Sequence, residues 1–144
     1  MKAVIQRVTS ASVSIHNKEI ARIRKGLLIF FGVAAGDNEE DARMIAEKIS
    51  KLRIFADEKG KMNRSLVEIN GAALVVSQFT LLADTKKGNR PSFAGAASPE
   101  KAKSLYELFI EELKRCGVGD IQRGEFGAYM QVSLVNDGPV TIVM

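Results

Sequence analysis

Hydrophobic and polar residues in the first third of the chain follow patterns that predict β-strands. Residues 11–15 alternate apolar and polar side chains, which is typical of a strand with one buried face. Residues 3–8 are rich in apolar side chains, and residues 27–33 form a continuous apolar run that suits a buried central strand. A turn at residues 16–18 leads into a further strand over residues 19–23, so the pattern predicts a hairpin.

Two later segments carry apolar residues at helical spacing and begin at capping residues. In the first, Asp37 is the expected N-cap, and Glu40 three residues later has capping-box spacing. In the second, Ser98 is a good N-cap, Pro99 suits the first helical position, and Gly117 provides a natural stop. The apolar positions are Ala42, Ile45, Ala46 and Ile49 in the first helix, and Ala102, Leu105, Tyr106, Phe109 and Leu113 in the second.

Further strands are expected over residues 74–82, 121–125, 130–134 and 140–143. The strands occur in runs rather than alternating with helices. The sequence therefore predicts an α+β fold with two main helices and a mostly antiparallel, barrel-like sheet. The length of 144 residues suits a single domain over residues 1–144.

Composition narrows the class of protein. Hydrophobic residues make up 46% of the chain, as in ordinary folded proteins. The longest apolar run, residues 26–35, is far shorter than the roughly 20 residues of a membrane span, and the first residues lack a signal-peptide pattern. We therefore expect a cytoplasmic location and no membrane partner. The net charge of +4 permits contact with a polyanion, but the basic residues are scattered, so a DNA duplex is not an expected partner.

The chain lacks the residues that several common catalytic and ligand-binding sites require. The single histidine, His16, falls in the predicted hairpin turn, which argues against a Ser-His-acid triad and a histidine-rich zinc site. The single cysteine, Cys116, excludes an intramolecular disulfide and, without a histidine partner, is interpreted as a structural thiol. Glycines at residues 32–36 lack a P-loop lysine. The acidic residues 37–41 are interpreted as helix-start charges, so no metal or cofactor is expected.

Two polar spots inside apolar segments remain as candidates for chemistry. Ser77, Gln78 and Thr80 fall in the predicted strand over residues 74–82, although each buried polar group costs about 1–3 kcal/mol unless it is paired. Residues 136–139, Asn-Asp-Gly-Pro, separate two apolar runs near the end of the chain. A plain turn explains them. The alternative is a Gly-cis-Pro turn that aims two successive carbonyl groups in one direction.

Four stretches together resemble the D-aminoacyl-tRNA deacylases of the bacterial and eukaryotic type. They are QRV at residues 6–8, EKISKLRIF at 47–55, VVSQFTLLADTKKGNRPSF at 75–93 and SLVNDGPVT at 133–141. The resemblance spans essentially the whole chain. It implies a homodimer, with active sites at the subunit interface, that hydrolyses the ester between a D-amino acid and the terminal adenosine of tRNA.

The resemblance also implies which residues form the site. The SQxT motif of the family corresponds to residues 77–80, Ser77, Gln78, Phe79 and Thr80, which are the expected catalytic residues. Its Gly-cis-Pro motif corresponds to Gly138 and Pro139, which are expected to enter the partner's site and hold the chiral centre. Arg7 is expected to brace that loop, and Met130 to line the substrate site. The expected tRNA contacts, in the loop after the catalytic strand, are Lys86, Lys87 and Arg90, for which a plain solvated surface is the alternative.

Three questions about the expected site concern substrate selection, the role of Thr80 and an alternative function. A rigid pair of carbonyls accepts the substrate ammonium group and rejects the L-enantiomer by clash, so glycyl-tRNA is expected to pass the same filter. Thr80 is either a nucleophile or an orienting group. Because no histidine is available as a base, hydrolysis assisted by the substrate's own 2′-hydroxyl is favoured. A noncatalytic binder of single-stranded RNA ends is the alternative function, and the low aromatic content of 6% argues against it.

Overall fold

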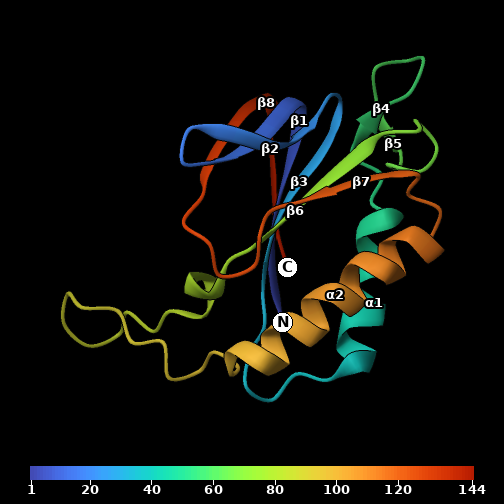
Figure 1. Ribbon diagram of the computed structural model, residues 1–144. Helices are drawn as coiled ribbons and strands as arrows, with labels where there is room; N and C mark the ends of the chain where they lie inside the picture. Colours follow the sequence, from blue (N-terminus) through green and yellow to red (C-terminus); the bar gives the residue numbers. More distant parts are fainter.

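Eight strands, two α-helices and one 3-10 helix form the fold, and the computed structural model describes residues 1–144 (Figure 1). Their order is β1 (Lys2–Ile15), β2 (Lys18–Ile23), β3 (Gly26–Gly32), α1 (Glu39–Ser50), β4 (Phe55–Ala56), β5 (Met62–Arg64), β6 (Ala72–Ser77), the 3-10 helix η1 (Phe79–Leu82), α2 (Pro99–Arg115), β7 (Asp120–Arg123) and β8 (Gln131–Val143). None of the helices is long and apolar enough to cross a membrane.

The main sheet has the strand order β2-β1-β3-β6-β7, and β8 pairs with β1. The pairs that involve β1 are antiparallel, whereas β3–β6 and β6–β7 are parallel. The prediction of a mostly antiparallel sheet is therefore corrected for this half of the molecule. Helices α1 and α2 lie in the connections from β3 to β6 and from β6 to β7, and such crossovers return the next strand in the same direction. The predicted α+β class, two helices and barrel-like curl are confirmed (Figure 1).

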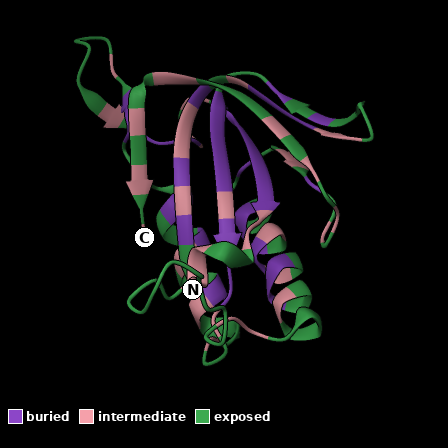
Figure 2. Cartoon of the chain, turned by 90° about the vertical axis from the view of Figure 1, so that its left-hand side faces the viewer, coloured by how far each residue is buried: buried purple, intermediate pink, exposed green.

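The continuous apolar runs of β3 and β6 are explained by burial on both faces of the sheet (Figure 2). Alternate residues, such as Ile29 and Val75, pack with α1 and α2 in the larger hydrophobic cluster. Their neighbours, such as Leu28 and Leu74, face a second cluster inside the curl of the sheet, together with residues of β1 and β2. These two clusters fix β6 from both sides, and thereby fix the position of the residues that follow it.

The helix boundaries follow local capping, with one correction. Asn38, rather than Asp37, is the N-cap of α1, and its side chain accepts hydrogen bonds from the backbone N–H groups of Glu40 and Asp41 at 2.8 and 3.3 Å. The Asp37 carboxylate instead accepts a hydrogen bond from the backbone N–H of Ala34 at 2.6 Å, so it stabilises the turn before the helix. The predicted start of α2 is confirmed, because Ser98 is its N-cap and Pro99 its first residue.

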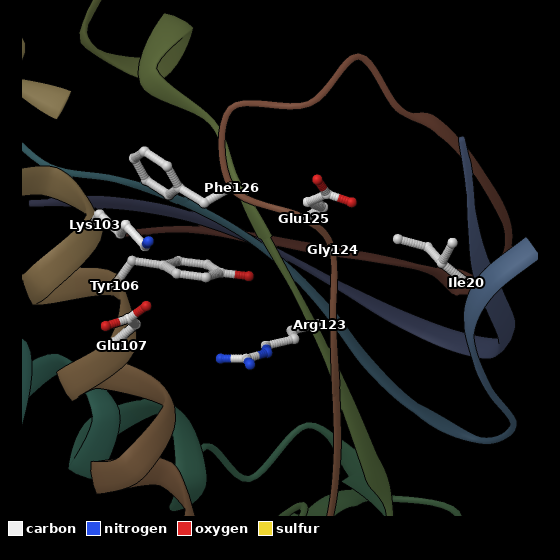
Figure 3. Close-up of a pocket in the computed structure, with 8 residues that line it drawn as sticks. All are labelled: Ile20, Lys103, Tyr106, Glu107, Arg123, Gly124, Glu125 and Phe126. Carbon is white, nitrogen blue, oxygen red and sulfur yellow. The ribbon is translucent and has the colours of Figure 1, made fainter. Parts of the chain in front are cut away.

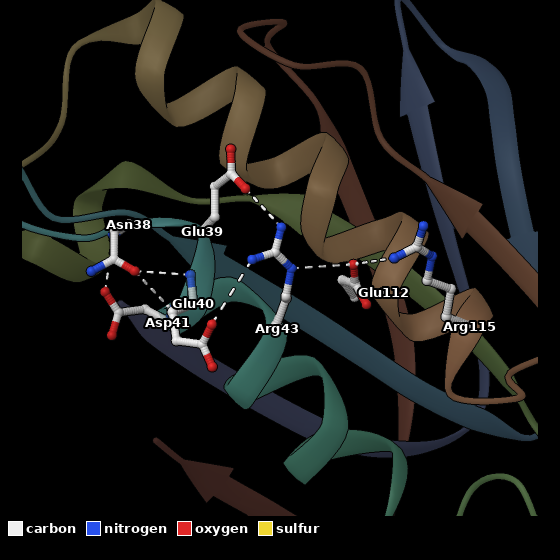
Figure 4. Close-up of polar contacts among 7 residues, drawn as sticks. All are labelled: Asn38, Glu39, Glu40, Asp41, Arg43, Glu112 and Arg115. Carbon is white, nitrogen blue, oxygen red and sulfur yellow. Dashed lines mark hydrogen bonds and ion pairs between the residues drawn. The ribbon is translucent and has the colours of Figure 1, made fainter.

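An ionic contact links the two helices. Glu112 of α2 is only 9% exposed, and its Oε1 atom lies 3.6 Å from Nε of Arg43 on α1 (Figure 4). Arg115, one turn further along α2, approaches the same oxygen at 3.1 Å. A carboxylate this buried needs such cationic partners. The contact therefore helps to hold α1 and α2 in register against the sheet.

The predicted first hairpin is confirmed, whereas the predicted turn near the end of the chain is not a hairpin. His16 and Asn17 have φ angles of 49° and 61° and form a tight turn between β1 and β2. Residues on both sides of the Asn136–Pro139 segment pair with the same strand, β1, so β8 is one strand interrupted by a bulge. Turn-forming residues between two apolar runs suit either arrangement, and pairing with the long β1 decides between them.

Candidate active site

The polar residues that follow Val76 lie where β6 ends, not in its interior. Ser77 is the last residue of β6 and pairs with Phe31 of β3, and the backbone N–H of Gln78 donates to the Phe31 carbonyl oxygen at 2.8 Å. The chain then turns into η1, which begins at Phe79. The strand predicted over residues 74–82 therefore ends at Ser77. Because Ser77 and Gln78 are only half-buried, their polar groups avoid the cost of a fully apolar environment.

A glycine on β3 allows this turn to pack closely against the sheet. A Cβ atom at Gly32 would lie 2.7 Å from the backbone oxygen of Gln78 and 2.6 Å from the Leu82 side chain. Real side chains do not tolerate such distances to backbone. Gly32 is therefore a positioning residue for the Gln78 backbone rather than part of a nucleotide-binding loop.

The side chains at the start of η1 are open to solvent. Thr80 is exposed, and its hydroxyl is contacted by Nε2 of Gln78. Phe79 is 58% exposed, and its ring packs edge-on against Phe93 with the ring centres 5.0 Å apart. Ser77 forms no side-chain hydrogen bond within the chain. An accessible hydroxyl, an amide and an exposed aromatic ring thus meet at one strand end.

A cavity of about 420 Å³ opens beside this strand end and has a mostly apolar lining. Ser77, Gln78, Phe79 and Met130, four of the site residues expected from the resemblance, line it, whereas Thr80 does not. The remaining lining residues come from the ends of β3 and β6, from α2 and the residues before it, and from β8 and the residues before it: Phe31, Gly32, Val33, Val76, Ala96, Ala97, Pro99, Ala102, Tyr106, Phe126, Gly127, Ala128, Tyr129 and Val132. Its size suits a nucleoside-sized ligand.

No carboxylate, histidine, lysine or arginine lines this cavity. The buried Tyr106 donates its hydroxyl hydrogen to the Val75 carbonyl oxygen at 2.9 Å. Burial raises the pKa of Tyr106 well above its ordinary value, so the phenol stays neutral near neutral pH. His16 lies in the β1–β2 turn and Cys116 at the end of α2, both outside the lining. The cavity therefore offers no side-chain general base that is ionised at neutral pH.

The Gly138–Pro139 segment forms the tip of the bulge in β8, and Arg7 of β1 holds it. The Nε atom of Arg7 donates to the backbone oxygen of Asp137 at 3.1 Å and lies 3.3 Å from the Asp137 carboxylate. Its Nη1 atom donates to the Ile54 carbonyl at 2.6 Å. Gly138 has φ +125°, and the Gly138–Pro139 peptide bond is cis. Both residues are exposed, and neither lines the apolar cavity of the same chain.

A second cavity, of about 440 Å³, adjoins the first and is charged (Figure 3). Tyr106 and Phe126 line both cavities. Figure 3 shows the Arg123 side chain pointing towards α2, where Glu107 lies. None of the residues predicted from the sequence lines this second cavity, so the candidate active site is assigned to the apolar one.

The predicted tRNA contacts lie apart from both cavities. Lys86, Lys87 and Arg90 are exposed in the loop between η1 and α2, which extends away from the sheet in Figure 1. Backbone hydrogen bonds between Asp84 and Ser92, at 2.8 and 2.9 Å, close the base of this loop.

Sequence reasoning missed the wall formed by the start of α2 and the segment before it. Ala96, Ala97 and Ala102 line the cavity because their short side chains leave it open. A run of small residues before a helix N-cap was the available signal. Gly124 was missed as well: a Cβ atom there would lie 2.6 Å from the sulfur of Met130, so the glycine makes room for that cavity-lining side chain.

Comparison with known proteins identifies the family of the whole chain. The family model described as D-Tyr-tRNA(Tyr) deacylase matches residues 4–144. The chain is 58% identical to a D-aminoacyl-tRNA deacylase of Roseiflexus castenholzii, over 100% of this chain and 91% of the relative. It is 54% identical to the enzyme of the same name from Thermosipho melanesiensis, over 100% of this chain and 96% of the relative.

Two solved structures share the fold. One, named c-Myc DNA Unwinding Element Binding Protein, has a TM-score of 0.95 and 42% identity, covering 100% of this chain and 97% of that one. The other, titled a probable eukaryotic D-amino acid tRNA deacylase, has a TM-score of 0.85 and 16% identity, covering 99% and 97%.

Proposed function

The chain belongs to the D-Tyr-tRNA(Tyr) deacylase family and is a D-aminoacyl-tRNA deacylase, and from this premise we propose how its residues select and cleave the ester. The reaction is hydrolysis of the ester that joins a D-amino acid to the terminal adenosine of tRNA. The observation that carries the proposal is that Ser77 and Gln78 line an apolar cavity large enough for a nucleoside.

The ester lies at the start of η1, with the adenosine in the apolar cavity. The first N–H groups of a helical turn have no partner within the turn, so those of Phe79 and Thr80 are suited to an oxyanion. Donors aimed at the developing charge stabilise the tetrahedral intermediate more than the ground state. Gln78, whose amide contacts Thr80, orients the threonine hydroxyl towards the ester or the attacking water.

The attacking water is activated by the substrate rather than by a side chain. The lining of the cavity contains no carboxylate or histidine, and the Tyr106 phenol is neutral and engaged with Val75. An aminoacyl ester carries a 2′-hydroxyl next to the scissile bond, and this group assists proton transfer. Thr80 then orients the reactants and forms no covalent intermediate.

The backbone carbonyls of the Gly138–Pro139 segment act as the chiral filter. They accept the substrate ammonium group and leave room behind the chiral carbon for a hydrogen only. Arg7 supports this segment by linking it to the rest of the chain. Its side chain contacts the carbonyl and carboxylate of Asp137, and it also donates to the Ile54 carbonyl. Because such a filter excludes a side chain without reading its identity, mischarged glycyl-tRNA is also a substrate.

The filter of each site comes from a second copy of the chain. Gly138 and Pro139 are exposed and lie outside the cavity of their own chain, so one copy alone lacks the filter at its site. On the same strand, β8, the apolar side chains of Leu134, Val135 and Val143 are 38%, 57% and 72% exposed. Exposed apolar side chains along one strand are suited to burial in an interface. A homodimer covers them and completes two sites.

Turnover separates this proposal from binding without catalysis. Purified protein at a concentration far below that of D-Tyr-tRNA should release free D-tyrosine from many equivalents of substrate. Stoichiometric binding without release would support a nucleic-acid binder instead. The name of the 42% identical solved structure motivates adding duplex DNA as a competitor: unchanged turnover is expected, and strong inhibition would favour a DNA-binding role.

A further inference from the structure

We propose that Gln6 is a positioning residue that sets the shape of the Gly138–Pro139 bulge by joining its two ends; the inference rests on the filter described above. The Oε1 atom of Gln6 accepts a hydrogen bond from Nδ2 of Asn136 at 2.9 Å and another from Oγ1 of Thr141 at 2.6 Å. Asn136 and Thr141 are the residues at which β8 leaves and rejoins its pairing with β1.

The pairing register of β1 and β8 shows why a side chain that bonds to both ends of the bulge matters. Gln6 pairs with Thr141 and Val8 pairs with Asn136, so residues 137–140 of β8 face only Arg7 of β1. The extra residues of a bulge have no regular partners on the facing strand. The separation of the two ends of the bulge is therefore not fixed by the regular ladder, and a side chain that bonds to both ends fixes it.

Gln6 and Arg7 hold different parts of the bulge. Neighbouring residues on a strand point to opposite faces. Arg7 fixes Asp137, the first residue of the bulge, whereas Gln6 bonds to the two residues at its base. The Oδ1 atom of Asn136 is buried and has no partner in the chain, so its bond to Gln6 is the only side-chain hydrogen bond that Asn136 forms. Loss of Gln6 therefore releases this end of the bulge.

The expected consequence is a loss of chiral selectivity rather than a loss of fold. A filter that works by clash requires its carbonyls to be placed within about 0.5 Å, and a displacement of about 1 Å changes rates on the order of 100-fold. A looser bulge admits the L-enantiomer and holds the D-enantiomer less well. If Gln6 only helped β8 to pack, selectivity per folded molecule would not change.

Four variants test the proposal with matched chemistry. Gln6→Met keeps the length of the side chain and removes the acceptor, whereas Gln6→Glu keeps an acceptor oxygen at the same position. Thr141→Val removes one hydroxyl donor at constant shape, and Thr141→Ser retains it. Gln122→Met serves as a control, because the Gln122 amide bonds only to Asp120 on β7, away from the bulge.

Two measurements are made on each dimeric protein: the ratio of kcat/KM for D-Tyr-tRNA and L-Tyr-tRNA, and the hydrogen exchange of the amides of Asp137, Gly138 and Val140. Gln6→Met should lower the D/L ratio about tenfold or more and speed this exchange, with a smaller change in Thr141→Val. Gln6→Glu, Thr141→Ser and Gln122→Met should retain wild-type values. Wild-type selectivity and exchange in Gln6→Met would overturn the positioning role alone. Equal rates on both enantiomers in the wild type would instead overturn the filter.

Discussion

The Tyr106 hydroxyl donates to the Val75 carbonyl oxygen at 2.9 Å and so ties α2 to β6 two residues before Ser77. The same carbonyl also accepts the backbone N–H of Gly124 at 2.9 Å. Because that second bond remains when the hydroxyl is removed, Tyr106→Phe should lower the free energy of unfolding by only about 0.5–1.5 kcal/mol at neutral pH. Urea unfolding of both proteins at neutral pH measures this difference.

The same substitution predicts a specific pH dependence. Burial raises the pKa of Tyr106 above the ordinary value of about 10, so the unfolded chain releases this proton first as pH rises. Tyr106 therefore destabilises the fold above about pH 10, by up to about 1.4 kcal/mol per pH unit, and has no such effect below that pH. The stability difference between wild type and Tyr106→Phe should shrink between about pH 10 and pH 11. A constant difference over this range would contradict the assignment.

Removal of the Thr80 hydroxyl should slow the reaction without abolishing it. If Thr80 only orients the ester or a water, Thr80→Ala should lose about 1–3 kcal/mol of transition-state stabilisation, or roughly ten- to a few-hundred-fold in kcat. Loss of a nucleophile would cost on the order of 10⁴-fold or more. Thr80→Ser is the matched control. A tRNA that ends in 2′-deoxyadenosine should bind but react poorly. An acyl-Thr80 ester trapped by mass spectrometry would refute substrate assistance.

A charged side chain introduced on β8 should both separate the subunits and abolish deacylation. Val135→Glu places a carboxylate on β8, where the valine side chain is 57% exposed, and Met44→Glu places one on α1, where the side chain is 59% exposed. Light scattering should show a monomer for Val135→Glu and a dimer for Met44→Glu, and only the former should lose deacylation. A fully active monomer would show that each chain carries a complete site.

The loop after η1 should contribute to tRNA affinity through charge. Removal of both charges in Lys86→Ala/Lys87→Ala should raise KM and reduce the slope of log KM against log salt by roughly one unit per lost phosphate contact. The control is Lys59→Ala/Lys61→Ala, which removes two charges from the β4–β5 turn. An unchanged slope in the first variant would assign Lys86 and Lys87 to the plain solvated surface.

Local patterns in the sequence predicted those parts of the fold that depend on neighbouring residues. Alternation over residues 11–15, the His16–Asn17 turn and the Ser98–Pro99 helix start all have local causes, and the structure confirms them. The bulge in β8 depends on a partner strand far away in sequence, so the residues between Val135 and Val140 looked like a turn between two strands.

The geometry of the candidate site also depends on contacts between residues that are distant in the sequence. The position of Ser77 and Gln78 at a strand end depends on the packing of η1 over Gly32, which no local pattern encodes. The parallel pairing of β6 and β7 likewise depends on where α1 and α2 pack. No local pattern indicates a role for Gln6, because that role depends on bonds to both ends of a distant bulge.

The Gly138–Pro139 carbonyls are proposed to distinguish enantiomers by excluding a side chain. Initial rates of hydrolysis of D-Tyr-tRNA, L-Tyr-tRNA and glycyl-tRNA by the wild-type protein test this filter most directly. The filter predicts rapid release of D-tyrosine and of glycine, and no release of L-tyrosine above the rate without protein. Comparable rates on the two tyrosyl enantiomers would contradict it.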